Sequence, residues 1–163
     1  MTLSIARGTM DDVPDADRII REVAAWLDAR GESLWGPNEI SRDALVAVAQ
    51  AGELIIGRMG TEAVACMYMH NSDSEFWPED GPGEAFYIHR LAVARHFAGR
   101  GFAHAMLAWA EGEARAQARP FVRLDCVPRP KLIRLYEAAG FARVDPGPVK
   151  VGEHWVIRQQ KRV

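Results

Sequence analysis

The spacing of apolar residues along the chain predicts where its helices and strands lie. Apolar positions three or four residues apart, with capping residues before them and glycines after them, predict helices over 9–31, 41–51, 103–115 and 130–139. Apolar runs rich in aromatic and β-branched residues predict strands over 3–7, 53–59, 62–70, 84–93, 121–127, 141–144 and 154–159. The resulting order is βααβββαβαββ.

This order predicts a single α+β domain over residues 1–163 with a mixed, mostly antiparallel sheet and helices on both faces. Neither repeats nor linker-like changes of composition divide the chain. A chain of 163 residues is long enough to bury one core without disulfides or metal ions. We therefore expect one domain.

Charge and cysteine content narrow the possible partners. The net charge is −2 and the pI is about 6.2, which gives no electrostatic reason to expect nucleic acid or an anionic membrane. Residues 1–8 lack the apolar core of a signal peptide, and no apolar run is long enough to span a bilayer, so we predict a cytoplasmic protein. Cys66 and Cys126 lie in apolar strands and are interpreted as buried thiols, and no metal-ligand spacing occurs. We expect no metal.

The turn AGRGFA, residues 98–103, joins a predicted strand to an amphipathic helix. Gly99 and Gly101 let the backbone approach a ligand closely, and the first N–H groups of the helix have no intrahelical acceptor. Such a turn suits a pyrophosphate. A dinucleotide site would instead need G-x-G-x-x-G early in the chain with an acidic residue about 20 positions later, and neither is present.

The turn resembles the acetyl-CoA signature of the GNAT superfamily of N-acetyltransferases, Q/R-x-x-G-x-G/A, with Gly101 and Ala103 in its fourth and sixth places. Ala98 departs from the first place, although Arg100 and Arg95 could supply charge. A second segment, RLYEAAGF at 134–141, resembles the family's L-Y-E-x-x-G-F motif. The resemblance implies the GNAT fold, acetyl-CoA as co-substrate and N-acetyltransferase activity.

In this family a thioester carbonyl is held beside an amine, and the resemblance implies that the strands carrying Leu91 and Leu124 splay to admit the pantetheine arm. A bulge near Ala92 and Val93 would leave a backbone N–H that can polarise the carbonyl. Direct transfer in a ternary complex needs no cysteine nucleophile. The predicted contacts to acetyl-CoA are Leu91, Ala92, Val93, Ala98, Gly99, Arg100, Gly101, Phe102 and Ala103.

Two residues are candidates for proton transfer. His89 alternates onto the face of Leu91 and resembles the histidine of arylalkylamine N-acetyltransferases at the same offset from L-A-V, so it is our candidate base. A histidine in an apolar strand is more often a hydrogen-bonded core residue, and Glu84, Asp125 and His154 remain alternatives. Tyr136 is the candidate donor to the departing CoA thiolate.

The acceptor site is predicted from an acidic, aromatic loop. Residues 71–88 carry five carboxylates and no lysine or arginine, which suggests a small cationic amine as acceptor. The predicted acceptor contacts are Trp35, Trp77, Glu84 and Asp125. The ordinary interpretation is a solvated loop with tryptophans that pack its base. The sequence leaves open a homodimer, and it leaves open a non-catalytic GNAT-like acyl-CoA-binding or protein-interaction module.

Overall fold

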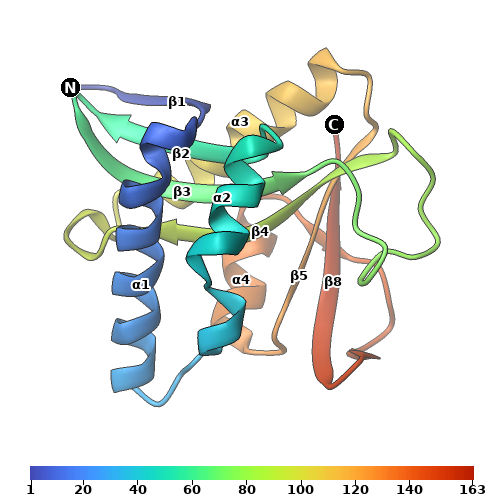
Figure 1. The fold of residues 1–163 in the computed structure, drawn as a ribbon. Helices are drawn as coiled ribbons and strands as arrows, with labels where there is room; N and C mark the ends of the chain where they lie inside the picture. Colours follow the sequence, from blue (N-terminus) through green and yellow to red (C-terminus); the bar gives the residue numbers. More distant parts are fainter. The chain divides into compact units, whose positions relative to one another are not determined.

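A computed structural model describes residues 1–163. Its helices are α1 (Val13–Ala29), α2 (Arg42–Gln50), α3 (Phe102–Ala116) and α4 (Pro130–Ala138). Its strands are β1 (Leu3–Arg7), β2 (Leu54–Met59), β3 (Glu62–His70), β4 (Ala85–Val93), β5 (Phe121–Cys126), β6 (Ala142–Arg143), β7 (Val149–Val151) and β8 (His154–Arg162). The predicted order is confirmed, and β7 is a short additional strand (Figure 1).

The chain forms two compact units, each built from separate stretches of sequence. The first unit contains residues 1–69 and 90–106, and the second contains residues 70–89 and 107–163. Strand β4 and helix α3 therefore each contribute residues to both units. A single domain over the whole chain stays a prediction.

In the first unit, β2 pairs antiparallel with β1 and with β3. Helices α1 and α2 lie side by side against these strands (Figure 1). The helices share a buried cluster with β2 and β3 that includes Ile20, Leu45, Leu54, Cys66 and Tyr68. A capping box at Thr9 precedes α1, and the Ser41 hydroxyl caps α2, as the pattern of capping residues predicted.

In the second unit, the first half of β4 pairs with β5 in parallel, and β5 pairs with β8 antiparallel. Strands β6 and β7 both pair with β8. Helix α4 packs Ile133 against Cys126 of β5 and Ile157 of β8. Of the pairings within the two units, only β4 with β5 is parallel, which confirms a mixed, mostly antiparallel sheet.

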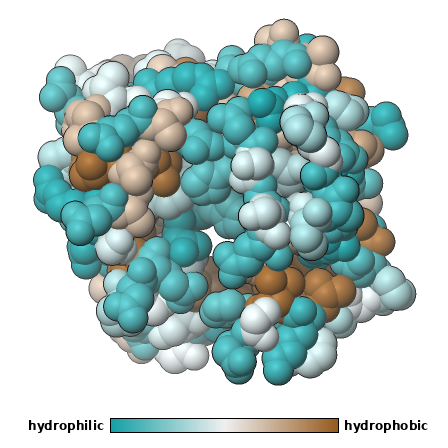
Figure 2. Space-filling view, turned by 45° about the vertical axis from the view of Figure 1, so that its right-hand side comes forward, coloured by the Kyte–Doolittle hydropathy of each residue, from teal (hydrophilic) through white to brown (hydrophobic).

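The surface has little continuous apolar area on the face shown in Figure 2, where hydrophilic colours dominate and apolar colour is limited to separate patches. The most exposed large apolar side chain after Met1 is Trp155 of β8, at 55%. None of the helices combines the length and the hydropathy that a membrane crossing requires.

Candidate active site

The glycine turn predicted to bind acetyl-CoA has the backbone that such a cradle needs. Gly99 and Gly101 have φ angles of 78° and 79°, where a residue with a Cβ is strained by about 1–2 kcal/mol. A Cβ placed on either glycine would meet no atom within 4 Å, so open space lies above both. Helix α3 begins directly afterwards at Phe102, with its first N–H groups at this turn. The turn therefore lets a ligand approach the backbone closely and offers it the first N–H groups of α3, which have no acceptor within the helix.

Aromatic rings support the turn from within the first unit. Phe97 and Phe102 stack with ring centroids 5.9 Å apart, and the Arg100 guanidinium lies 4.9 Å from the centre of the Phe97 ring. Arg95 lies 3.6 Å from the centre of the Trp26 ring, so its charge is held against α1. Arg100 is thus the better placed of the two arginines to meet a phosphate.

Strand β4 has an irregular backbone at Arg90, two residues before the place where the sequence predicts a bulge. Arg90 has a φ of 52°, the left-handed region that a non-glycine residue rarely adopts within a strand. The bulge was expected near Ala92 and Val93. A left-handed residue interrupts the alternation of a strand, so the regular alternation that would place His89 and Leu91 on one face is broken at Arg90.

Arg90 also accounts for the place of Trp35. Its guanidinium lies 5.7 Å from the centre of the Trp35 ring, and its Nε donates to the carbonyl of Glu39 at 3.1 Å. Trp35 packs against the buried cluster of the first unit. This loop tryptophan is therefore half-buried and held by a cation–π contact.

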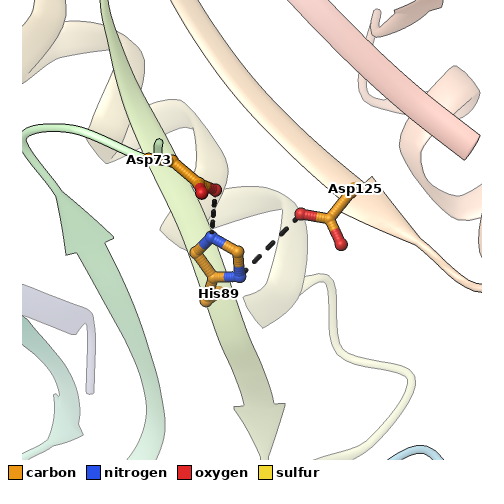
Figure 3. A group of neighbouring side chains, drawn as sticks. All are labelled: Asp73, His89 and Asp125. Atoms are coloured by element: carbon orange, nitrogen blue, oxygen red, sulfur yellow. Dashed lines mark hydrogen bonds and ion pairs between the residues drawn. The ribbon is translucent and has the colours of Figure 1, made fainter. Parts of the chain in front are cut away.

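His89 lies where β4 and β5 stop pairing. The parallel ladder ends at Ile88 and Leu124, so His89 and Asp125 are the first residues beyond it. Figure 3 shows the imidazole between two carboxylates: Nε2 lies 2.8 Å from Oδ2 of Asp73, and Nδ1 lies 3.9 Å from Oδ1 of Asp125. The three side chains are 16%, 7% and 11% exposed in the order His89, Asp73, Asp125. The structure thus brings together two of the residues predicted from sequence, His89 and Asp125.

Asp73 was not predicted as a site residue, because it lies in the loop after β3, 16 positions before His89. Its Oδ1 accepts from the backbone N–H of Phe76 at 3.0 Å. Burial alone would raise the pKa of Asp73, but the hydrogen bonds from His89 and the Phe76 amide hold that pKa below its usual value. Asp73 is therefore a carboxylate at neutral pH. The signal that could have found it is its place among the five carboxylates of residues 71–88.

Tyr136 lies on α4 and packs with the apolar cluster of Cys126, Ile133 and Ile157. Its ring meets Phe141 edge-on, with centroids 6.2 Å apart. Burial raises the pKa of Tyr136 above its usual value, so the phenol keeps its proton throughout the physiological range. Gly140, with a φ of 93°, ends α4 in the way that the LYEAAGF motif predicts.

Three of the five carboxylates of the acidic loop, Glu79, Asp80 and Glu84, are paired by arginines from distant strands. Arg123 of β5 reaches Asp80 at 2.6 Å and Glu84 at 3.2 Å. Arg158 of β8 reaches Glu79 at 2.6 Å and forms a two-pronged pair with Asp145, through Nε at 2.8 Å and a terminal nitrogen at 2.9 Å. The loop itself has no basic residue, but its charge is largely compensated.

Trp77 is the centre of this network. It is only 2% exposed, and the guanidinium carbons of Arg123 and Arg158 lie 5.0 and 4.6 Å from the centre of its indole ring. Trp77 packs the base of the loop, the ordinary role that the sequence left open. Glu84 accepts from the Gly81 amide at 3.0 Å as well as pairing with Arg123, so its oxygens are occupied.

Cys66 and Cys126 are buried thiols, as the sequence predicted. Both are free thiols, and burial raises the pKa of Cys66 and of Cys126 to about 12. At neutral pH neither supplies a thiolate. His154, an alternative base, is exposed at the start of β8 next to β7.

The remaining predicted contacts to acetyl-CoA lie in regular elements. Leu91, Ala92 and Val93 form the end of β4, and Ala92 is buried. Ala98 has an extended backbone after a short 3₁₀ turn, and Ala103 lies in the first turn of α3.

The fold and this set of residues define an acyltransferase. The family model for the acetyltransferase (GNAT) family matches residues 18–141, which include the glycine turn, His89 and Tyr136. The chain belongs to this family, and the resemblance seen in its sequence motifs is confirmed. As a GNAT enzyme it uses acetyl-CoA as acetyl donor.

One relative among curated proteins is the uncharacterized N-acetyltransferase YesJ of Bacillus subtilis, 30% identical over 123 residues, which are 72% of this chain and 68% of that protein. A GNAT acetyltransferase structure from Listeria monocytogenes superposes with a TM-score of 0.79 at 21% identity, covering 99% of this chain and 95% of the other. YncA of Salmonella typhimurium, whose structure contains its cofactor acetyl-CoA, gives a TM-score of 0.73 at 15% identity, over 99% and 94% of the two chains. These structures confirm the GNAT fold.

Proposed function

We propose that this acetyltransferase acetylates a small, cationic primary amine by direct attack in a ternary complex. The observation that carries the proposal is His89, an imidazole flanked by two carboxylates at the point where β4 and β5 part. Such a group can take a proton from an ammonium, and the two negative charges offset the imidazolium that results. The thiols of the chain are unsuited to a covalent intermediate.

The residues of the glycine turn fit the pyrophosphate of acetyl-CoA. The open space above Gly99 and Gly101, the first N–H groups of α3 and the Arg100 guanidinium together suit a dianionic ligand. Acetyl-CoA, when bound, supplies an activated acetyl thioester. The backbone of Leu91 to Val93, at the end of β4, is our proposed contact for the pantetheine arm and the carbonyl.

Removal of a proton from the amine is the step that most needs the protein. An alkylamine with a pKa of about 10.4 is neutral in only about one molecule in a thousand near pH 7.4, which corresponds to about 4 kcal/mol. His89 accepts this proton after the ammonium has docked. General-base catalysis of this kind contributes about 10²- to 10⁴-fold.

Tyr136 assists the leaving group by donating a hydrogen bond. A thiol pKa of about 8.5 lies about 1.5 units below that of an ordinary phenol, so full proton transfer to the thiolate would cost about 2 kcal/mol. Burial raises the pKa of Tyr136 further and makes full transfer less favourable still. A hydrogen bond that shortens as charge grows on sulfur is the role that fits, and its loss would slow turnover without abolishing it.

The negative charge that favours a cationic acceptor lies beside His89 and not in the arginine-paired part of the acidic loop. Glu79, Asp80 and Glu84 of the acidic loop are paired with Arg123 and Arg158, so they attract an ammonium only weakly. Asp73 and Asp125 beside His89 provide two negative charges in a poorly exposed place instead. Trp77 is too deeply buried to cover the acceptor. We keep the proposal that Trp35 contacts the apolar part of the acceptor amine.

The experiment combines an amine screen with a pair of histidine variants. Release of CoA is followed with alkylamines, arylalkylamines, peptide amino termini and phosphorylated amines as acceptors. With the best acceptor, His89→Gln should lower kcat about 100-fold near pH 7 and recover activity as the pH approaches the pKa of the amine. His154→Gln, which removes the exposed alternative base, is the matched control and should keep the wild-type kcat.

Two outcomes would overturn the proposal. Wild-type activity in His89→Gln would exclude His89 as the base, and a preference for phosphorylated amines would exclude the cationic acceptor. Binding of acetyl-CoA without turnover on any amine would favour the second candidate, an acyl-CoA-binding module without activity.

A further inference from the structure

We propose that Asp73 is a positioning residue that fixes the tautomer of His89, so that Nδ1 is the atom that accepts the proton of the acceptor amine. The inference rests on the proposed function, in which His89 is the base. The sequence indicated Asp73 only as one of the five carboxylates of the acidic loop and assigned it no contact with His89. Asp73 touches His89 and acts through it.

The contact between Asp73 and His89 determines which nitrogen carries the hydrogen. An ionised carboxylate has only acceptor sites, and Oδ2 of Asp73 lies 2.8 Å from Nε2 of His89, a normal hydrogen-bond length. Nε2 must therefore be the donor. In the neutral imidazole the other nitrogen, Nδ1, then has no hydrogen and presents its lone pair.

The second carboxylate does not compete for the same role. Oδ1 of Asp125 is 3.9 Å from Nδ1, well beyond the 2.7–3.2 Å of an N–H···O hydrogen bond, so Asp125 does not hold a hydrogen on that nitrogen. At this distance Asp125 still attracts a positive charge. The difference between 2.8 and 3.9 Å makes the two sides of the ring unequal, as Figure 3 shows.

Asp73 and the ring are both held in place by their neighbours. Oδ1 of Asp73 accepts from the N–H of Phe76 at 3.0 Å, and the backbone carbonyl of Asp73 accepts from the N–H of Trp77 at 2.9 Å. The His89 ring contacts those of His70 and Phe76, with centroids 5.3 and 6.0 Å away. The same turn therefore orients the carboxylate and supplies Phe76, whose ring contacts that of His89.

The proton balance of the step is simple. One N–H bond of the substrate ammonium breaks and an Nδ1–H bond forms, which leaves a neutral amine able to attack the thioester. The imidazolium keeps its Nε2–H bonded to Asp73, and no proton moves onto the carboxylate. After the product leaves, the proton on Nδ1 passes to solvent and the same tautomer is restored.

The tautomer can be measured in the wild-type protein without any assay of activity. Nitrogen-15 NMR of the imidazole distinguishes a protonated nitrogen from one with a lone pair, and the His89→Gln spectrum assigns the signals. At a pH where His89 is neutral, we expect hydrogen on Nε2 and a lone pair on Nδ1. Hydrogen on Nδ1 in the wild-type protein would overturn the proposal by itself.

Asp73→Asn is the decisive variant because an amide can reverse the hydrogen bond. If the side-chain oxygen keeps the Phe76 N–H, the NH₂ group faces Nε2 and favours the tautomer with hydrogen on Nδ1. We expect kcat to fall between about 10- and 100-fold with the KM for acetyl-CoA unchanged, together with a change of tautomer. Asp73→Glu keeps a carboxylate and should retain the wild-type tautomer and part of the activity.

Asp80→Asn separates positioning from general support of the loop. Asp80 lies in the same loop and bonds Arg123 at 2.6 Å and the Tyr87 hydroxyl at 2.5 Å, but it does not touch His89. The Asp80→Asn variant should have a lower Tm, but its His89 tautomer and its kcat should stay near those of the wild-type protein. Equal kcat losses in Asp80→Asn and Asp73→Asn, or an unchanged tautomer in Asp73→Asn, would show a structural role only. Loss of activity in His89→Gln with an unchanged tautomer in Asp73→Asn would refute this inference and leave the proposed function standing.

Discussion

Replacing Gly101 by aspartate, with asparagine as the matched control, tests the glycine turn as the phosphate site. The two side chains have nearly the same shape, and both tolerate the left-handed backbone better than other residues. Gly101 has a φ of 79° and open space where a Cβ would lie, so either side chain should be accommodated with similar strain. The variants then differ by one negative charge.

The size of the effect follows from the exposure of the turn. Gly101 is exposed, so water screens a new charge, and a unit charge about 5 Å from a phosphate at a dielectric constant of about 80 costs about 0.8 kcal/mol. Two charges of a pyrophosphate raise this to about 1.6 kcal/mol. The Kd for acetyl-CoA should therefore be about 15-fold higher in Gly101→Asp than in Gly101→Asn.

Isothermal titration with acetyl-CoA at two salt concentrations measures this ratio. It should decrease at high salt, since interactions between exposed charges are screened beyond about 8 Å at physiological ionic strength. Thermal unfolding of both variants provides the control for folding, and the two Tm values should agree within a few degrees. Equal Kd values for two folded variants would refute the placement of the phosphates on this turn.

Two further predictions concern Tyr136 and the ion pair beneath the acidic loop. Tyr136→Phe should lower kcat about tenfold or less with little change in the KM for acetyl-CoA, and a loss above about 1,000-fold in steady-state kinetics would contradict a role limited to one hydrogen bond. The Arg158 hydrogen bonds hold the pKa of Asp145 below its ordinary value of 3.8. The ion pair therefore stabilises the folded state above pH 3.8, and this stabilisation is lost as the pH falls through the lowered pKa. Asp145→Asn should therefore cost about 1–2 kcal/mol at pH 7, which lowers Tm by about 2–8 °C, and this deficit should shrink as the pH falls through the lowered pKa. A deficit that shrinks at no acid pH in a melting series would exclude the ion pair as its source.

The local elements of this protein were determined by its sequence. Capping residues, apolar stripes and glycines act over a few positions, and the hydrogen bonds of a helix or a tight turn close over the same range. This is why the helices, seven of the strands, the turn at Gly99 and Gly101 and the glycine end of α4 could be predicted. The family resemblance then followed from two motifs in the right order, and His89 was found at its offset from the L-A-V triplet at 91–93.

Tertiary structure decided how these elements combine into a site. The parallel register of β4 and β5 places Asp125 beside His89, and the turn after β3 brings Asp73 to the other side of the ring. Those contacts join residues 16 and 36 positions apart, so no local pattern records them. The left-handed backbone of Arg90 within β4 is likewise a feature that no local pattern indicated.

The pairing of charges shows most clearly which features are local in the sequence and which depend on the tertiary structure. The acidic loop looked uncompensated because its own residues include no base, whereas Arg123 and Arg158 reach it from β5 and β8 across dozens of positions. An electrostatic contact depends on separation in space, not along the chain, and pairing of distant strands is what makes that separation small. The sequence alone determined which chemical groups the protein carries and which turns present them; only the folded sheet decided which charges lie within reach of His89.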